Sequence, residues 1–239
     1  VQHTAGELAD YIGAPFEETG HWVAGVNHQA WFLGFEWNGE DAYPLLREAM
    51  EDPDVYERDI VRFEMMKFFG HFITESSQHN SEYVPYFRKN PEMIRRFTNR
   101  RGPSAGVESF VASTEAWKKR RASQAKQLRE EAYGDAPVEI QSGMEYVSGI
   151  FNALESNEPF RFNGNVMNTG LITNLPQDCA VEVPCLVDNM GVHPCHVGDL
   201  PPQCAALNRG RIAGDQLMVK GIIERDRKAI EQAISLDPL

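Results

Sequence analysis

Polar side chains that can bind metals or sugars gather in a few short segments of this 239-residue sequence. The first segment reads Gly25-Val26-Asn27-His28 and follows an apolar stretch. A histidine at the end of an apolar strand can face a cleft, and neutral imidazole is a good ligand for divalent metals. Taken alone, such a histidine is more often structural, so a metal role for His28 depends on the other segments.

The second segment, residues 72–88, combines hydrogen-bonding side chains with flanking aromatic rings and contains His79, Glu82, Tyr83 and Arg88. Loops of this kind commonly bind hydroxyl-rich ligands such as sugars through hydrogen bonds and ring stacking. A tyrosine can act as a general base only where a nearby cation lowers its pKa from about 10. A metal or Arg88 could supply that charge. An ordinary polar surface loop remains the alternative interpretation.

Two later segments are also polar. Residues 163–176 hold many asparagines and glycines, which is typical of turns, although an asparagine could also point into a pocket. Residues 179–185 alternate in polarity like a half-buried strand, in which Glu182 could face a ligand. For Glu182, a salt bridge on the strand is the favoured interpretation.

Several enzyme classes lack their motifs here. The sequence contains no Gly-x-Ser-x-Gly, no His-Glu-x-x-His and no Ser-His-Asp order, so hydrolysis by an activated serine is not supported. It also contains no Gly-x-Gly-x-x-Gly or P-loop for phosphate binding. A pair of catalytic carboxylates stays open, since acidic residues are abundant but no pair stands out by spacing.

Helices are expected to surround a small sheet that positions these segments. Residues 22–37 predict two strands broken near Asn27 and His28, and residues 159–197 predict short strands joined by turns. The ranges with helical spacing are 5–13, 41–51, 55–69, 104–132 with Ser104 as N-cap, 143–155 and 200–235. No regular strand–helix alternation appears, which favours an α+β fold, mostly helical with an embedded mixed or antiparallel sheet.

Composition limits the partners and the compartment. The net charge of -12 argues against nucleic acid and anionic membranes, and no apolar run is long enough to span a bilayer. The four cysteines form no Cys-x-x-Cys pair, which favours a reducing, cytoplasmic location. The chain starts with Val1 instead of methionine, which suggests a piece of a longer protein.

The order of these motifs is more specific than any one of them. It runs Gly-Val-Asn-His, then Phe-Gly-His-Phe-Ile-Thr-Glu-Ser-Ser-x-His-x-x-Glu-Tyr, then Gly-Asn-Val-x-Asn-x-Gly-Leu-Ile-x-Asn-Leu-Pro, then Val-Glu-Val-Pro-Cys. This order resembles glycoside hydrolase family 4 over the whole chain, residues 1–239, and within that family the bacterial α-galactosidases. The resemblance implies the fold of the C-terminal domain of the lactate/malate dehydrogenase-like superfamily.

The resemblance also implies an unusual chemistry. Members of this family are an exception to the two-carboxylate mechanism and use NAD and a divalent metal, usually Mn²⁺. The sugar C3 hydroxyl is oxidised, a base removes the C2 proton, the aglycone is eliminated, water adds, and the ketone is reduced again. His28 matches the metal-binding histidine and Tyr83 the proton-abstracting tyrosine. Asn27, His79 and Asn165 are candidates for contacts to the sugar.

Departures from the family pattern imply that the chain is only part of an enzyme. The N-terminal dinucleotide-binding domain, a cysteine metal ligand expected just before Val1, and the final helix or helices have no counterpart here. The resemblance therefore implies one protein metal ligand, no NAD site and an inactive fragment. It also implies a galactoside substrate and a dimer or tetramer for the parent protein. Action on an α-glucoside or glucuronide, or a non-catalytic sugar-binding or oligomerisation module, are the alternatives.

Overall fold

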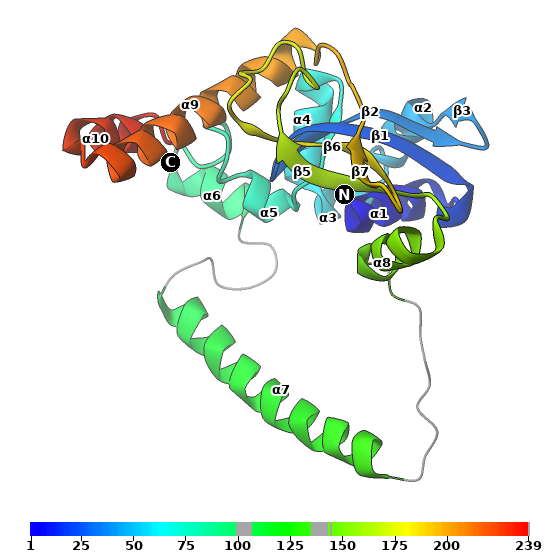
Figure 1. The fold of residues 1–239 in the computed structure, drawn as a ribbon. Helices are drawn as coiled ribbons and strands as arrows, with labels where there is room; N and C mark the ends of the chain where they lie inside the picture. The colour runs from blue at the N-terminus through cyan, green and yellow to red at the C-terminus, as the bar shows by residue number, and fades with distance from the viewer. Residues whose placement is uncertain (99–106, 135–142, 144, 239) are drawn as a thin grey trace.

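A computed structural model describes residues 1–98, 107–134, 143 and 145–238 of the chain. Its centre is one seven-stranded sheet with the order β3-β2-β1-β6-β5, in which β4 pairs with β2 and β7 with β6 (Figure 1). The strands are β1 (Thr19–Val26), β2 (Gln29–Trp37), β3 (Glu40–Asp41), β4 (Phe72–Ile73), β5 (Phe160–Met167), β6 (Ala180–Asp188) and β7 (Gly191–Pro194). Every one of these strand pairs is antiparallel. The predicted α+β class is confirmed.

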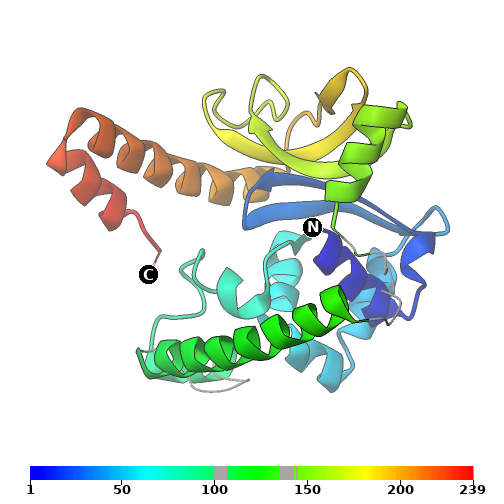
Figure 2. The same ribbon diagram turned by 60° about the horizontal axis from the view of Figure 1, so that its bottom comes forward.

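The other elements are helices. They are α1 (Gln2–Ile12), the short 3-10 helix η1 (Phe16–Glu18), α2 (Tyr43–Ala49), α3 (Pro53–Arg58), α4 (Ile60–Phe69), α5 (Ser77–Asn80), α6 (Pro91–Phe97), α7 (Val107–Tyr133), α8 (Val147–Ser156), α9 (Pro202–Glu224) and α10 (Arg227–Ser235). The early helices, blue to cyan in Figure 2, lie on one side of the β1–β2 hairpin, and β5 and β6 lie on the other. Helix α9 runs outward from the sheet and α10 folds back beside it.

The hairpin of β1 and β2 carries large apolar side chains into the core. Phe32 and Phe35 pack with Phe63 and Phe72 in one apolar cluster, and Trp31 packs with residues of α4 in another. Burial of each large apolar side chain stabilises the fold by about 1.5–3 kcal/mol. The hairpin is therefore a rigid base for the residues at its turn.

The turn of this hairpin consists of Asn27 and His28, as the break between the two predicted strands indicates. Just before it, Gly25 has φ +153°, and a Cβ there would lie 2.7 Å from the Cα of Ala30. Only glycine fits this close approach. The Nδ2 of Asn208 on α9 donates to the Gln29 carbonyl at 2.7 Å and ties α9 to the same turn.

Three expectations about helices need correction. Residues 55–69 do not form one helix, because Asp59 (φ -138°, ψ 35°) separates α3 from α4. Residues 72–88, interpreted from the sequence as a loop, contain β4 and α5. Residues 200–235 form two helices divided at Arg225, which has φ 56°. Ser104, predicted as an N-cap, lies outside the described residues.

Two further predictions can be compared with the structure. All four cysteines are free thiols, and Cys185 and Cys204 are buried. Among the helices that the structure describes, none combines the length and apolarity required to cross a membrane.

Candidate metal and sugar site

His28 occupies an uncommon backbone conformation with φ 67°. Non-glycine residues adopt such angles rarely, and they do so more often at functional sites. Its Nδ1 forms a short hydrogen bond with Oε2 of Glu75, which lies in the loop after β4. An imidazole that donates through Nδ1 carries its lone pair on Nε2, where a metal would bind.

The Glu75 carboxylate is held in its ionised form by its neighbours. Burial acts to raise its pKa, but the backbone N–H of Ser76 and the His28 ring together bring the pKa below its ordinary value. The Ser76 N–H donates to Oε1 at 2.7 Å. The two carboxylate oxygens of Glu75 are thus engaged by different partners, and the side chain has a defined orientation.

A second histidine lies beside the first. The ring centroids of His28 and His79 are 5.3 Å apart, and Nδ1 of His79 lies 2.7 Å from Oε2 of Glu82. Arg88 donates to the other oxygen of Glu82 at 2.9 Å. The opposite nitrogen of His79, Nε2, lies 3.1 Å from the hydroxyl of Tyr83. This chain of contacts fixes the Tyr83 hydroxyl at the site.

Tyr83 stacks on His28, with ring centroids 5.4 Å apart and an interplanar angle of 15°. The guanidinium of Arg211, from α9, lies over the Tyr83 ring, 5.3 Å from its centroid. Burial raises the pKa of Tyr83, and the Arg211 charge opposes that rise. Arg88, the cation that the sequence offered for this purpose, is paired with Glu82 instead.

The donor set at this point fits a divalent metal. One ligand atom each of His28, Glu75 and His79 lie within 4.8 Å of one another. Imidazole nitrogen and carboxylate oxygen together suit ions such as Mn²⁺, Fe²⁺ or Zn²⁺. The resemblance implied a single protein ligand in this chain, and the structure adds His79 as a further side chain close to that ligand, while Glu75 is engaged by His28 and Ser76.

A cavity of about 740 Å³ adjoins His28. Asn27 and Asn165, two of the predicted sugar contacts, line it together with Asp178, Asp215 and Gln216. Asn165 reaches this position because β5 pairs with β6, where Asn165 lies opposite Glu182. Amides and carboxylates around a cavity of this size suit a hydroxyl-rich ligand.

Charges at the cavity balance one another. Arg211 donates to Asp215 at 3.1 Å, and Lys220 pairs with Glu224 at 4.0 Å. The amide of Gln216 donates to Asp178 at 2.9 Å. Because each basic side chain that lines the cavity has an acidic partner, the cavity suits a neutral ligand better than an anionic one.

Glu182 lies buried on β6, opposite Gly25 of β1 and Asn165 of β5, and is 9% exposed. Burial raises the pKa of its carboxyl, while the positive charge of the Val1 amino group and of His28 lowers it. Among the described residues Glu182 forms no salt bridge, which differs from the favoured interpretation of the sequence.

The structure brings all five predicted site residues to one region. His28, His79 and Tyr83 are in mutual contact, and Asn27 and Asn165 line the adjoining cavity. Sequence reasoning assigned no role to Glu75, Arg211 or Asp215. Glu75 belongs to the Thr-Glu-Ser-Ser stretch of the quoted motif, so the sequence held an indication of its role. Arg211 and Asp215 on α9 lie outside every quoted motif.

NAD does not fit on this chain alone. The sequence has no glycine-rich strand–turn–helix to cradle its pyrophosphate. In the described part of the chain, the two basic side chains that line the cavity, Arg211 and Lys220, are paired with Asp215 and Glu224, and no helix N-terminus there is shown to cradle a phosphate.

Two imidazoles, a carboxylate and a tyrosine beside a polar cavity define a candidate metal-assisted site for a sugar-like ligand. The profile of the family 4 glycosyl hydrolase C-terminal domain matches residues 23–239. The chain belongs to this family.

Two curated relatives show the same relationship. The chain is 38% identical to an alpha-galactosidase of Bacillus subtilis (strain 168), over 100% of this chain and 54% of that protein. It is 33% identical to an alpha-galactosidase of Rhizobium meliloti (strain 1021), over 100% of this chain and 49% of that protein. The chain therefore spans about half the length of these relatives.

Solved structures share the fold. The lplD protein of Bacillus subtilis, described as a glucosidase, superposes with a TM-score of 0.80 at 21% identity, over 99% of this chain and 57% of that chain. A 6-phospho-alpha-glucosidase from gut microorganisms, solved with NAD and Mn²⁺, gives a TM-score of 0.74 at 19% identity, over 100% of this chain and 55% of that chain. At these identities the likeness concerns the fold.

Proposed function

We propose that this chain is the C-terminal, substrate-binding part of an NAD- and Mn²⁺-dependent α-galactosidase of the cytoplasm. The observation that carries the proposal is the contact of His28, His79 and Tyr83 beside a cavity lined by Asn27 and Asn165. The two alpha-galactosidases at 38% and 33% identity support the galactoside as substrate. The dinucleotide-binding domain would lie in another part of the whole protein, which we expect to form a dimer or tetramer.

Each site residue has a role in the proposal. His28 holds the metal, and Tyr83 takes the proton from C2 of the sugar, for which the charges of the bound metal and of Arg211 would have to offset the rise in pKa that burial causes. Asn27 and Asn165 accept hydrogen bonds from sugar hydroxyls and donate hydrogen bonds to them. His79 contacts the sugar beside Tyr83. When bound, NAD would accept and return the C3 hydride, and the metal would polarise the oxygens at C2 and C3.

A neutral galactoside is preferred over the charged alternatives. A phosphorylated sugar or a glucuronide needs a cation that is available to its anionic group. Arg211, Lys220 and Arg88 each have an acidic partner in this structure. An α-glucoside has the same charge as an α-galactoside, so only a substrate panel separates those two.

The proposal is tested with the whole protein and p-nitrophenyl α-galactoside. We expect hydrolysis that requires NAD, Mn²⁺ and a reductant, stops when EDTA removes the metal, and exceeds hydrolysis of the α-glucoside, glucuronide and 6-phosphoglucoside analogues. His28→Ala should abolish the metal-dependent activity, because it removes a ligand. His193→Ala, in the exposed strand β7, is the matched control and should retain activity. Near-normal activity of His28→Ala would refute the metal assignment.

The isolated chain separates the enzyme from a non-catalytic module. Since NAD does not fit on this chain, residues 1–239 alone should not hydrolyse the galactoside. Calorimetry of the isolated chain with Mn²⁺ measures how much of the metal site it carries. Tight one-to-one binding would contradict the implied dependence on a ligand outside the chain.

A further inference from the structure

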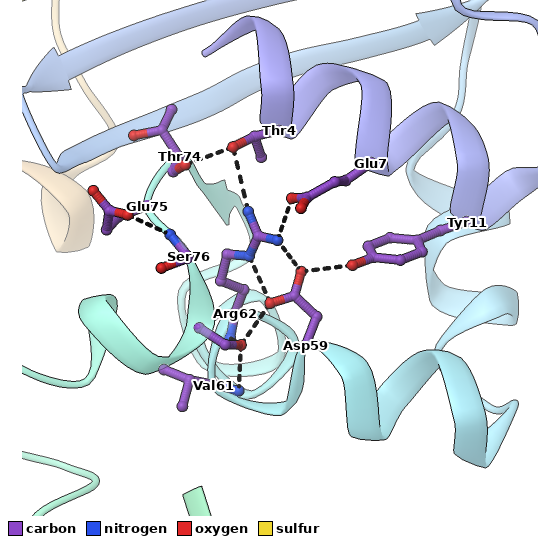
Figure 3. A network of polar contacts seen from close by, with 10 residues as sticks. Thr4, Glu7, Tyr11, Asp59, Val61, Arg62, Thr74, Glu75 and Ser76 are labelled. Carbon is purple, nitrogen blue, oxygen red and sulfur yellow. Dashed lines mark hydrogen bonds and ion pairs between the residues drawn. The ribbon is translucent and has the colours of Figure 1, made fainter. Parts of the chain in front are cut away.

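A buried ion pair lies beneath the candidate site, outside the cavity that adjoins His28. Arg62 on α4 is 3% exposed and Asp59, at the break before α4, is 1% exposed. The Nε of Arg62 donates to Oδ1 of Asp59 at 2.6 Å, and the second carboxylate oxygen pairs with its terminal nitrogen (Figure 3). Burial removes both charges from water, and further hydrogen bonds are needed to offset that desolvation cost.

Those further bonds come from two elements that lie far apart in the sequence. On α1, Thr4 accepts from Arg62 at 3.3 Å, Glu7 accepts at 2.5 Å, and Tyr11 donates to Asp59 at 3.0 Å. From α5, the Ser77 hydroxyl donates to Asp59 at 2.5 Å. The pair therefore joins α1, α4 and the start of α5.

The loop that carries Glu75 is fixed on both sides of that residue. Before it, the Thr74 carbonyl accepts from the hydroxyl of Thr4 at 2.6 Å, and the Thr74 N–H donates to the Ala30 carbonyl of β2 at 3.0 Å. After it, the Ser77 hydroxyl donates to Asp59 and accepts from the Val61 N–H at 3.1 Å. Glu75 lies between these two anchors, so they determine where its carboxylate meets His28.

We propose that Asp59, Arg62 and Ser77 are positioning residues, which hold loop 74–77 so that Glu75 orients the His28 ring for metal binding. The inference rests on the proposed function, because it presumes that His28 binds the metal. Carboxylates that orient a metal-ligating histidine commonly change metal affinity about 10–100-fold when they are replaced. Residues that hold such a carboxylate should therefore alter Mn²⁺ affinity without touching the ion.

The test measures the Kd for Mn²⁺ in the whole protein from the electron paramagnetic resonance signal of free Mn²⁺. Ser77→Ala removes the hydroxyl that joins loop 74–77 to Asp59 and to the start of α4, and should raise Kd about 10-fold, whereas Glu75→Gln should raise it about 10–100-fold. Ser77→Thr keeps a hydroxyl and should bind Mn²⁺ within about twofold of the original protein.

A stability control separates positioning from general loosening. Leu46→Ala creates a cavity in the core at α2 without removing a hydrogen bond to loop 74–77, and should lower the melting temperature without changing Kd. A Kd for Ser77→Ala that equals the original value, or that equals the Kd of Leu46→Ala when both are raised, would overturn the inference. If the original protein binds no Mn²⁺, the proposed function itself fails, and that result is seen before any variant is compared.

Discussion

His28 shows how much a single position in this fold is constrained. Its positive φ, the glycine at position 25 and the carboxylate of Glu75 together leave the ring one orientation. The sequence motif predicted that His28 and Tyr83 share a site, because the order of motifs matched a known family. The partner of His28 was not predictable, since a hydrogen bond between a hairpin turn and a distant loop leaves no periodic pattern in the sequence.

His21 gives a prediction about pH at the scale of one residue. Burial and the nearby charge of Arg161 lower its pKa from 6.5 to about 4. Between these two pH values the folded protein therefore binds fewer protons than the unfolded chain. The contribution of neutral His21 to the free energy of unfolding is complete above pH 6.5, and stability falls as the pH drops from 6.5 toward 4. Because water reaches the partly exposed ring, we expect a loss of about 1–2 kcal/mol, less than the full shift would give.

Replacement of His21 tests this directly. His21→Phe should remove that part of the acid sensitivity, because phenylalanine has no proton to bind and can pack on Phe32 as the imidazole does. Urea unfolding at several pH values between 4.5 and 7.5 measures the difference. The exposed His3→Phe serves as the comparison, and an equal flattening of the pH profile in both variants would contradict the assignment to His21.

Asp59 explains at the scale of elements why one helix became two. The apolar spacing of residues 55–69 continues across Asp59, so the sequence predicted one helix. Asp59 instead leaves the helical conformation and turns its carboxylate to Arg62 and Tyr11. Tertiary contacts override helical periodicity here. At Asp226 the sequence did hold a local signal, because an aspartate that accepts from Lys228 and Ala229 is a common N-cap.

The cost of removing Asp59 can be compared with that of a surface pair. Asp59→Ala leaves the Arg62 guanidinium buried without its main partner and should lower the free energy of unfolding by about 3–5 kcal/mol. Glu231→Ala breaks the exposed pair with Arg227 on α10 and should cost less than about 1 kcal/mol. Urea unfolding of both variants gives the two values. Similar costs would show that the buried pair contributes no more than a surface contact.

The whole molecule brings together strands that the sequence separates widely. Strand β6 pairs with β1 through Glu182 and Gly25, and this single junction carries Asn165 toward the hairpin turn. Alternation of polar residues predicted the strands, but the order of strands in the sheet depends on long-range pairing that alternation does not specify. Trp31 and Phe35 are fully buried core residues.

For the dimer or tetramer that we propose, the outer helices offer an exposed apolar surface. Ile222 and Ile223 on α9 and Ile234 on α10 are 65%, 75% and 62% exposed. We expect the whole protein to sediment as a dimer or tetramer, and the double replacement Ile222→Glu with Ile223→Glu to shift it toward the monomer. Met190→Glu, at an equally exposed position beside β7, should leave sedimentation unchanged. A monomeric original protein would contradict this expectation.

The pairing of Asp59 with Arg62 also has a consequence for the evolution of this sequence. Loss of either charge alone leaves the other buried without compensation, whereas apolar replacement of both can be nearly neutral for stability. A lineage can therefore leave this arrangement only by coordinated change at both positions. Across related sequences, positions 59 and 62 should covary, and that covariation should extend to position 7 because Glu7 contacts the same guanidinium.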